Sequence, residues 1–445
     1  QVAHAHLRAI CLDRSLLVVD EVHASDHYMT QLLKAVLRRH FASGGRAMLL
    51  SATLGSRSRR EYVSLTCPSV RDATLLEAEN TPYPAVTFAN GTTQPTPKAA
   101  GRSKTITFDL QPYAFEPEAI VPILIAALRA SARVMVVLNT VDRANNLLRA
   151  LESHPEVDQR ALFQCMGRVC PHHGRFAPQD RTVLDREVGK RLGPGSPGGP
   201  LIIVGTQTLE QSLDIDADLM ISDLAPADVL LQRVGRLHRH QRTRPSGYEE
   251  PRCIVLVPPH SLVQALDDRG QALAVYKRIG LGSVYEDLRI LELTMRTLAE
   301  RPTIKIPEDN RRLVEAVTHP DRLATLSDPK WLKHAELVEG QTMAQGVAAR
   351  EVLADFDAYF GEFEFNELGG HISARLGADS LQLPVDKPFM SPFGVKITEL
   401  VIPGHIAPQD RPEEITVEEV LECEVRLRCS DRRYRYSRYG LEVQP

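Results

Sequence analysis

The sequence predicts an α/β protein with two arrays of alternating strands and helices, followed by a C-terminal accessory domain. Short apolar runs such as residues 15–19 and 201–204 are typical of strands buried on both faces of a parallel sheet. Stretches with apolar residues at helical spacing follow several of these runs. Residues 81–117 contain six prolines and interrupt the alternation, as expected of a connection between two domains.

The first array occupies residues 1–80. The strand at 15–20 precedes a helix that begins near Asp26, in which apolar residues recur every three or four positions and mark one face. Glycines at 44 and 45 end this helix. A second buried strand at 47–50 follows. We expect these residues to be part of a parallel-sheet domain, with 81–117 as the linker and a short strand at 105–110.

The second array covers residues 118–285. Alternation of strands and helices along it implies a parallel sheet with helices on both faces. We expect a helical extension at 286–340 and a C-terminal accessory domain at 341–445, where the pattern is less regular. The expected strands are 134–138, 201–204, 219–222 and 253–257, and the expected helices are 118–130, 141–151 and 227–237.

Bulk composition is that of a soluble protein. The 53 basic and 57 acidic residues give a net charge of −4, which does not exclude a locally basic groove for nucleic acid. Seven scattered cysteines favour a reducing compartment over a disulfide framework. The purest apolar run, 119–128, is too short to cross a bilayer. We therefore expect a cytoplasmic protein that does not bind membranes.

An acidic pair, Asp20-Glu21, directly follows the first buried strand. Ligands of open parallel sheets lie at the carboxyl ends of strands. There Asp20 can hold Mg²⁺ and Glu21 can polarise the water that attacks a γ-phosphate, while His23 can report the nucleotide state. Ser51 and Thr53 follow the next strand and can couple that state to domain movement. The alternatives are a solvated acidic turn and an ordinary helix N-cap.

Two further stretches suit phosphate chemistry. In the turn after strand 201–204, Thr206 can contact a nucleic-acid backbone and Asp214 can face a nucleotide. In Gln232-Arg-Val-Gly-Arg-Leu-His-Arg239, helical spacing would place Gln232, Arg236 and Arg239 on one face. Two guanidiniums there can grip a triphosphate as arginine fingers. The alternatives are a capped helix with an acidic turn, and a basic solvated helix.

Together these stretches, in this order and spacing, resemble superfamily 2 helicases. The phrases beginning at Asp20, Gly205 and Asp223, with His173-Gly-Arg-Phe176 and Ile304–Asp309, resemble more closely the CRISPR-associated helicase-nuclease of type I interference. The resemblance covers about residues 10–315. It implies two RecA-like domains and a C-terminal domain that use ATP and Mg²⁺ to pull single-stranded DNA. It also implies recruitment to an R-loop by a multisubunit surveillance complex with guide RNA.

The sequence departs from that family in two respects. It contains no phosphate-cradling Gly-x-x-x-x-Gly-Lys-Ser/Thr loop and no His-Asp dipeptide of an HD nuclease. We therefore expect an N-terminally truncated chain whose first RecA-like domain is incomplete. Such a half-sheet would expose strand edges and apolar surface. Without the loop the chain alone would show no ATPase, helicase or nuclease activity.

Weaker patterns leave alternatives open. Cys165, Cys170, His172 and His173 could bind zinc, although their spacing fits poorly. The tail 432–439 mixes arginine and tyrosine, which suits either nucleic-acid binding or, slightly better, a solvated edge strand. Two other functions also remain. One is a superfamily 2 motor of another pathway, such as an RNA helicase or a repair translocase. The other is an inactive nucleic-acid-binding remnant.

Overall fold

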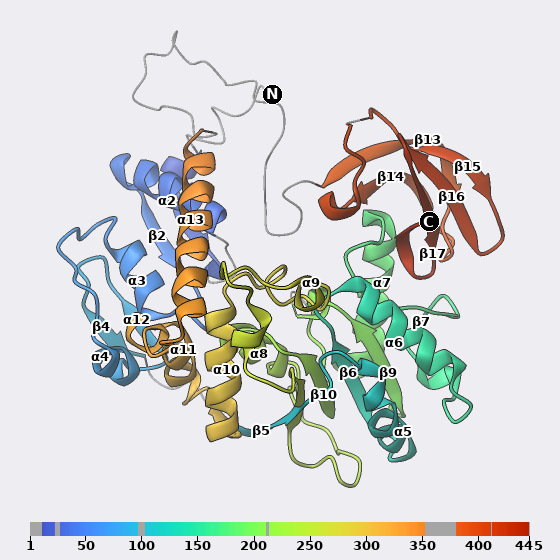
Figure 1. Ribbon diagram of the computed structural model, residues 1–445, viewed down its shortest axis with the longest axis horizontal. Helices are drawn as coiled ribbons and strands as arrows, with labels where there is room; N and C mark the ends of the chain where they lie inside the picture. The colour runs from blue at the N-terminus through green and yellow to red at the C-terminus, as the bar shows by residue number, and fades with distance from the viewer. Residues whose placement is uncertain are drawn as a thin grey trace. The chain divides into compact units, whose positions relative to one another are not determined.

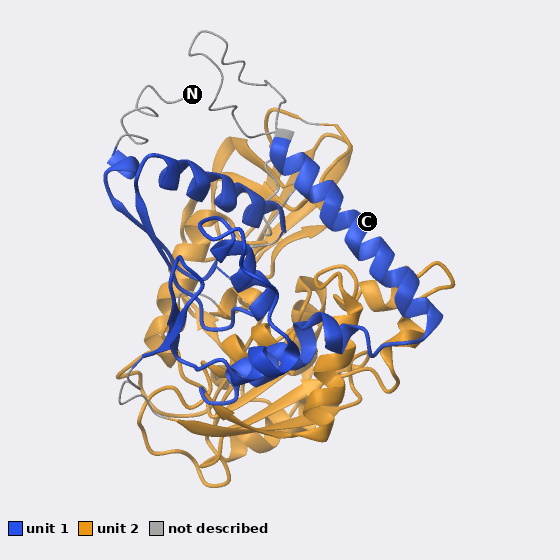
Figure 2. Cartoon of the chain, turned by 90° about the vertical axis from the view of Figure 1, so that its left-hand side faces the viewer, with its two compact units in different colours: residues 1–102, 307–378 blue, residues 103–306, 379–445 orange. Residues whose placement is uncertain are grey.

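A computed structural model describes residues 11–22, 27–96, 103–210, 213–351, 380–410 and 412–444. The chain forms two compact units, coloured separately in Figure 2, and each unit combines two separate segments. Unit 1 contains residues 1–102 and 307–378, and unit 2 contains 103–306 and 379–445. These units cut across the bounds that the sequence suggests, because the stretch 286–340 is divided between them. No helix among the described residues could span a membrane.

Unit 1 contains a short parallel sheet that is covered by helices on one face. Strands β1 (Leu16–Val19) and β2 (Arg46–Leu49) pair in parallel. The side chains of one face pack around the buried Leu37 of α2 (His27–Ala42). On the opposite face Leu16, Val18 and Met48 are about half exposed. The apolar surface that the sequence led us to expect is therefore present. The other elements of unit 1 are α3 (Ser56–Val63), α4 (Leu75–Asn80), β3 (Ala85–Thr87), β4 (Thr93–Pro95), α11 (Asn310–Thr318), α12 (Pro320–Leu323) and α13 (Pro329–Glu351).

A buried carboxylate joins the two segments of unit 1. Glu315 of α11 is 0% exposed and accepts hydrogen bonds from the amide and the hydroxyl of Ser56, at 2.6 and 2.7 Å. Arg311 donates to the carbonyl of Leu54 at 2.8 Å. Helix α13 packs against α2. The segment after residue 307 therefore completes the same unit as the first hundred residues.

Unit 2 is built on a six-stranded sheet with the order β12-β5-β11-β10-β6-β9, in which every neighbouring pair is parallel except β12 and β5. Figure 1 labels β5, β6, β9 and β10 of this sheet. The strands are β5 (Lys104–Gln111), β6 (Arg133–Val137), β9 (Leu201–Gly205), β10 (Leu219–Asp223), β11 (Arg252–Leu256) and β12 (Thr303–Ile306). Every residue of β6, β9 and β10 is buried, which is why their sequences are mostly apolar. The expected α/β class is confirmed.

Helices and short strands surround this sheet. Strand β5 confirms the short strand expected at 105–110, whereas β12 interrupts the expected helical extension. Both strands pair within the sheet, so their place is set by long-range partners. The remaining elements are η2 (Pro117–Ile120), α5 (Val121–Arg129), α6 (Val141–Ser153), η3 (Gln159–Ala161), β7 (Gln164–Cys165), β8 (Arg168–Val169), α7 (Pro178–Leu192), η4 (Gln207–Leu209), α8 (Ala227–Val234), η5 (Leu262–Ala265), α9 (Ala274–Lys277) and α10 (Leu288–Glu300).

The C-terminal part of unit 2 is all β. A hairpin of β13 (Leu381–Met390) and β14 (Lys396–Ile402) precedes η7 (Gly404–Ile406) and an antiparallel sheet in the order β15-β16-β17-β18. The four strands of the sheet are β15 (Thr416–Val420), β16 (Glu424–Cys429), β17 (Arg432–Ser437) and β18 (Gly440–Val443).

The arginine-tyrosine tail is an interior strand of this sheet, so its interpretation as an edge strand is wrong. The side chains of Tyr434 and Tyr436 are 0% exposed and cannot stack on bases. Arg433 and Arg435 are on the other face, where Arg435 forms an ion pair with Glu442 at 2.9 Å. The alternation of arginine and tyrosine therefore reflects the two faces of a central strand.

Buried polar contacts attach the C-terminal sheet to the α/β part of unit 2. The hydroxyl of Tyr436 donates to Asp180 at 2.6 Å and accepts from the amide of Ala177 at 3.0 Å. The Nε2 atom of His173 lies 3.1 Å from the carbonyl oxygen of Tyr439. Arg438 forms an ion pair with Glu152 of α6. These contacts make the sheet and the α/β core a single packed unit.

Candidate functional site

The acidic pair and the Ser-Ala-Thr stretch follow two adjacent parallel strands. Hydrogen bonds from Leu50 N to Val19 O, at 2.8 Å, and from Val22 N to Leu50 O, at 3.1 Å, continue the pairing past the strand ends. Asp20-Glu21 and Ser51–Thr53 therefore lie at the same carboxyl edge, where parallel sheets bind their ligands.

The backbone at the acidic pair is unusual. Glu21 has a φ of 55°, a left-handed conformation that costs a non-glycine residue about 1–3 kcal/mol. Asp20 accepts the amide hydrogen of Glu21 at 2.8 Å, and both side chains are exposed. Two solvent-facing carboxylates on a strained turn fit the few-carboxylate, water-rich coordination that Mg²⁺ prefers. His23, the third residue expected here, lies outside the described residues.

The coupling residues lie one strand away. The amide of Thr53 donates to the hydroxyl of Ser51 at 3.3 Å, and Tyr83 donates to the carbonyl of Ala52 at 2.9 Å. Thr53 is 6% exposed. Within the described part of the chain its hydroxyl has no hydrogen-bond partner. The turn is thus fixed by local hydrogen bonds and keeps a free hydroxyl near the carboxyl edge of the sheet.

In unit 2, Thr206 and Asp214 differ in accessibility. Thr206 follows β9, donates its amide to the carbonyl of His172 at 3.0 Å and is only 3% exposed. Its hydroxyl therefore lies beneath the surface that a nucleic acid would touch. Asp214 is exposed and accepts from Arg239 Nε at 2.6 Å and from His240 Nε2 at 2.9 Å. The hydrogen bonds from His240 and Arg239 hold the pKa of Asp214 below its usual range.

The helical geometry expected for Gln232, Arg236 and Arg239 is wrong. Helix α8 ends at Val234, so only Gln232 is helical, and the two arginines lie on the loop Gly235–His240, here called the arginine loop. A Cβ atom at Gly235 would come within 2.9 Å of the Gln232 carbonyl oxygen, and His238 has a φ of 48°. The chain leaves the helix after Val234, so Gln232, Arg236 and Arg239 do not share a helix face.

The loop nevertheless keeps Arg236 and Arg239 close to the segment that carries Asp214. Arg236 donates to the carbonyl of Glu210 at 3.0 Å, and Arg239 binds Asp214. Thus hydrogen bonds connect the arginine loop with residues 210 and 214, although no helix face is shared. These contacts to residues 210 and 214 were not expected from the sequence.

Sequence reasoning gave Arg233 no role of its own. Arg233 is 0% exposed, and its guanidinium contacts Glu210 at 2.7 Å, Ser222 Oγ at 2.7 Å and Tyr285 OH at 2.9 Å. Burial opposes the charge, but Glu210, Tyr285 and Asp223 together outweigh burial and raise the pKa of Arg233. Arg233 therefore ties α8 to β10 and supports the loop that follows.

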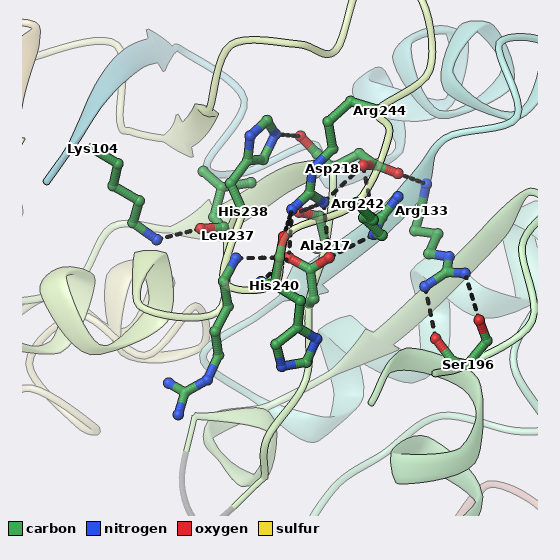
Figure 3. A network of polar contacts seen from close by, with 12 residues as sticks. Lys104, Arg133, Ser196, Ala217, Asp218, Leu237, His238, His240, Arg242 and Arg244 are labelled. Atoms are coloured by element: carbon green, nitrogen blue, oxygen red, sulfur yellow. Dashed lines mark hydrogen bonds and ion pairs between the residues drawn. The ribbon is translucent and has the colours of Figure 1, made fainter. Parts of the chain in front are cut away.

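A network of buried charges, also missed, surrounds the arginine loop (Figure 3). Asp216 and Asp218 are each 1% exposed. Arg244 bridges them, at 2.8 and 3.0 Å, and Arg242 does the same, at 2.6 and 2.8 Å. From the other side Lys104 donates to the carbonyls of Val234, at 2.8 Å, and Leu237. The solvated acidic turn, one of the alternatives that the sequence left open, is therefore wrong for Asp216 and Asp218, which are buried and ion-paired.

The zinc hypothesis finds no support in the geometry. No group of three or more His, Cys, Asp or Glu side chains in the described ranges could hold a metal ion. His172 already contacts Thr208 and Asp185, each at 2.8 Å.

Comparison with known proteins shows what the chain resembles. Residues 130–242 match the family model described as CRISPR-associated nuclease/helicase Cas3, C-terminal. The CRISPR-associated endonuclease/helicase Cas3 of Escherichia coli (strain K12) is 30% identical over 379 residues, which cover 80% of this chain and 38% of the relative. The corresponding protein of Thermus thermophilus is 31% identical over 71% of this chain and 36% of its own length. The chain thus spans about two fifths of these relatives.

Comparison with solved structures shows the same similarity to Cas3. Cas3 of T. fusca superposes with a TM-score of 0.63 at 27% identity, over 78% of this chain and 40% of that one. Its AMPPNP form gives a TM-score of 0.61 at 26% identity, with coverages of 78% and 40%. A chain from a structure described as a CRISPR RNA-guided surveillance complex, pre-nicking, gives 0.60 at 27% identity, with coverages of 79% and 42%.

Proposed function

We propose, from the similarity to Cas3 nuclease/helicases over most of this chain, that it forms part of an ATP-driven motor that moves along single-stranded DNA in CRISPR interference. The observation that carries the proposal is the placement of the resembling motifs. The acidic pair and Ser51–Thr53 share one carboxyl edge in unit 1. In unit 2 the arginine loop is bound to the segment that carries Asp214.

The chemistry follows from the residues that the chain supplies. Asp20 would hold Mg²⁺ through water and Glu21 would orient the attacking water, since both carboxylates are exposed at a strand end. Arg236 and Arg239 would stabilise charge on the transferred phosphoryl group, an effect worth on the order of 10³–10⁵ in rate. ATP bound with Mg²⁺ would supply the driving force for movement along DNA.

The proposed partners are single-stranded DNA and an R-loop-bound surveillance complex with guide RNA. Support for the complex is the similarity to the chain from the pre-nicking surveillance assembly. Support for nucleotide use is the similarity to Cas3 of T. fusca in its AMPPNP form. The two other functions, an RNA-directed or repair motor and an inactive remnant, serve as outcomes of the experiment.

The experiment measures ATP hydrolysis by the complete gene product and by residues 1–445 alone. We expect single-stranded DNA to stimulate hydrolysis by the complete product, and Glu21→Gln to abolish it. Glu156→Gln, at an exposed ion pair with Arg129, is the matched control and should leave the rate unchanged. The chain alone should show no hydrolysis, because it has no Gly-x-x-x-x-Gly-Lys-Ser/Thr loop.

Other results would overturn the proposal. Stimulation by RNA but not by single-stranded DNA would favour an RNA-directed motor. Absence of hydrolysis in the complete product with every polynucleotide would favour an inactive remnant. Hydrolysis by the chain alone that Glu21→Gln abolishes would contradict the expected inactivity of residues 1–445, but not the motor function.

A further inference from the structure

We propose that Asp216 is the positioning residue of the arginine loop, and that Lys104 fixes the loop from the opposite side. The inference rests on the proposed function, because it assigns these residues a purpose in orienting Arg236 and Arg239. Neither residue would touch nucleotide or DNA.

Asp216 binds the backbone of the loop directly. Its Oδ1 atom accepts the amide of Arg239 at 2.7 Å and that of His240 at 3.3 Å. Next to it, the amide of Ala217 donates to Arg236 O, and His238 N donates to Ala217 O, both at 3.0 Å. The segment Asp216–Asp218 is therefore joined to the arginine loop residue by residue, as two paired strands would be.

The charge of Asp216 is balanced by two arginines other than Arg236 and Arg239. Arg242 and Arg244 contact its Oδ2 atom at 2.6 and 2.8 Å. Burial raises the pKa of Asp216, but the bonds from Arg244 and Arg242 outweigh it and hold the pKa below its usual range. The carboxylate thus stays charged at neutral pH and keeps its strong hydrogen bonds to the loop amides.

Lys104 restrains the other side of the loop. Its side chain extends from β5, and its amine donates to the last carbonyl of α8. It also donates to the carbonyl of Leu237, the contact drawn in Figure 3. Burial, with help from nearby arginines, lowers the pKa of Lys104 to about 8. Lys104 binds the carbonyls of residues 234 and 237, and Asp216 binds the amides of residues 239 and 240. The backbone of the loop therefore has little conformational freedom. The backbone from which the side chains of Arg236 and Arg239 extend is therefore held in place.

The first test uses residues 1–445 and needs no enzymatic activity. Amide hydrogen exchange followed by mass spectrometry compares Asp216→Asn with Asp218→Asn. The second variant is a matched control, because Asp218 is equally buried and shares Arg242 and Arg244, but its carboxylate does not bind the loop backbone. We expect exchange in peptides spanning 235–240 to rise at least tenfold in Asp216→Asn and to stay within twofold in Asp218→Asn.

A second variant, Lys104→Met, keeps the test informative if Asp216→Asn does not fold. This residue is only partly buried on β5, and its replacement should also speed exchange at 235–240, with β10 unchanged. Equal exchange in all three variants, or equal acceleration by Asp216→Asn and Asp218→Asn, would overturn the inference.

The second test uses the complete gene product. Asp216→Asn should lower kcat for ATP at least tenfold with KM within twofold, because positioning acts on the transition state. A parallel rise in KM with unchanged kcat would overturn the positioning role. If the complete product hydrolyses no ATP, the proposed function fails, while the exchange experiment still decides whether Asp216 orders the loop.

Discussion

Replacing Arg233 by methionine should destabilise unit 2 far more than an ordinary surface substitution. Methionine keeps much of the side-chain volume but removes a fully buried cation that binds Glu210 at 2.7 Å. Breaking a buried ion pair by removing one partner costs roughly 3–5 kcal/mol, because the other charge stays in a low-dielectric site. The same free energy corresponds to about a 10²–10⁴-fold change in the population of open states.

The assay must report on unit 2 specifically. The single tryptophan, Trp331, lies on α13 of unit 1, so its fluorescence follows the other unit and serves as an internal control. Hydrogen exchange of β10, which Arg233 contacts through Ser222, gives a local free energy of opening. We expect that free energy to fall by roughly 3–5 kcal/mol, with the fluorescence transition unchanged.

A double variant separates the ion pair from simple loss of packing. Combining Arg233→Met with Glu210→Met removes both charges and should recover about 1–3 kcal/mol relative to the single change. A loss below about 1 kcal/mol in the single variant, or additive losses in the double variant, would refute the reasoning.

Three further predictions concern the C-terminal sheet and metal content. Tyr436→Phe deprives Asp180 and the Ala177 amide of a partner and should cost about 2–4 kcal/mol, seen as faster hydrogen exchange in β17 and β18. Burial holds the pKa of His173 well below its usual range, so stability is present above about pH 6.5 and lost as pH falls below it, by up to about 1.4 kcal/mol per pH unit. Urea midpoints from circular dichroism at pH 7.5 and 5.5 should show this drop, and His173→Gln should reduce it. Elemental analysis should find no stoichiometric zinc, and one zinc per chain would contradict the geometry.

Two buried strands of the unit 2 sheet could be predicted from sequence almost to the residue. The run expected at 201–204 is β9 (Leu201–Gly205), and the run expected at 219–222 is β10 (Leu219–Asp223). These strands are buried on both faces, so their composition alone identifies them. The carboxyl-edge position of Asp20 and Glu21 followed from the same pattern.

Features that depend on distant partners could not be predicted. The helical pattern continues past Gly235, yet Lys104 and Ala217 hold the chain in a loop through contacts with residues far along the sequence. Asp216 has the sequence signature of a solvated acidic turn, but its partners Arg242 and Arg244 bury it. Local spacing carries no information about such long-range contacts, so the residues that position the arginines could not be identified from the sequence.

The discontinuous composition of unit 1 has a consequence for synthesis on the ribosome. Ser56 emerges long before Glu315, its buried partner, and the whole of residues 103–306 must be made in between. At about 5–20 residues per second, this interval lasts roughly 10–40 s. During it helices α2 and α4 lack the packing that α13 and α11 later supply. Nascent chains should therefore engage holding chaperones at this stage, and slower translation should lengthen the exposure.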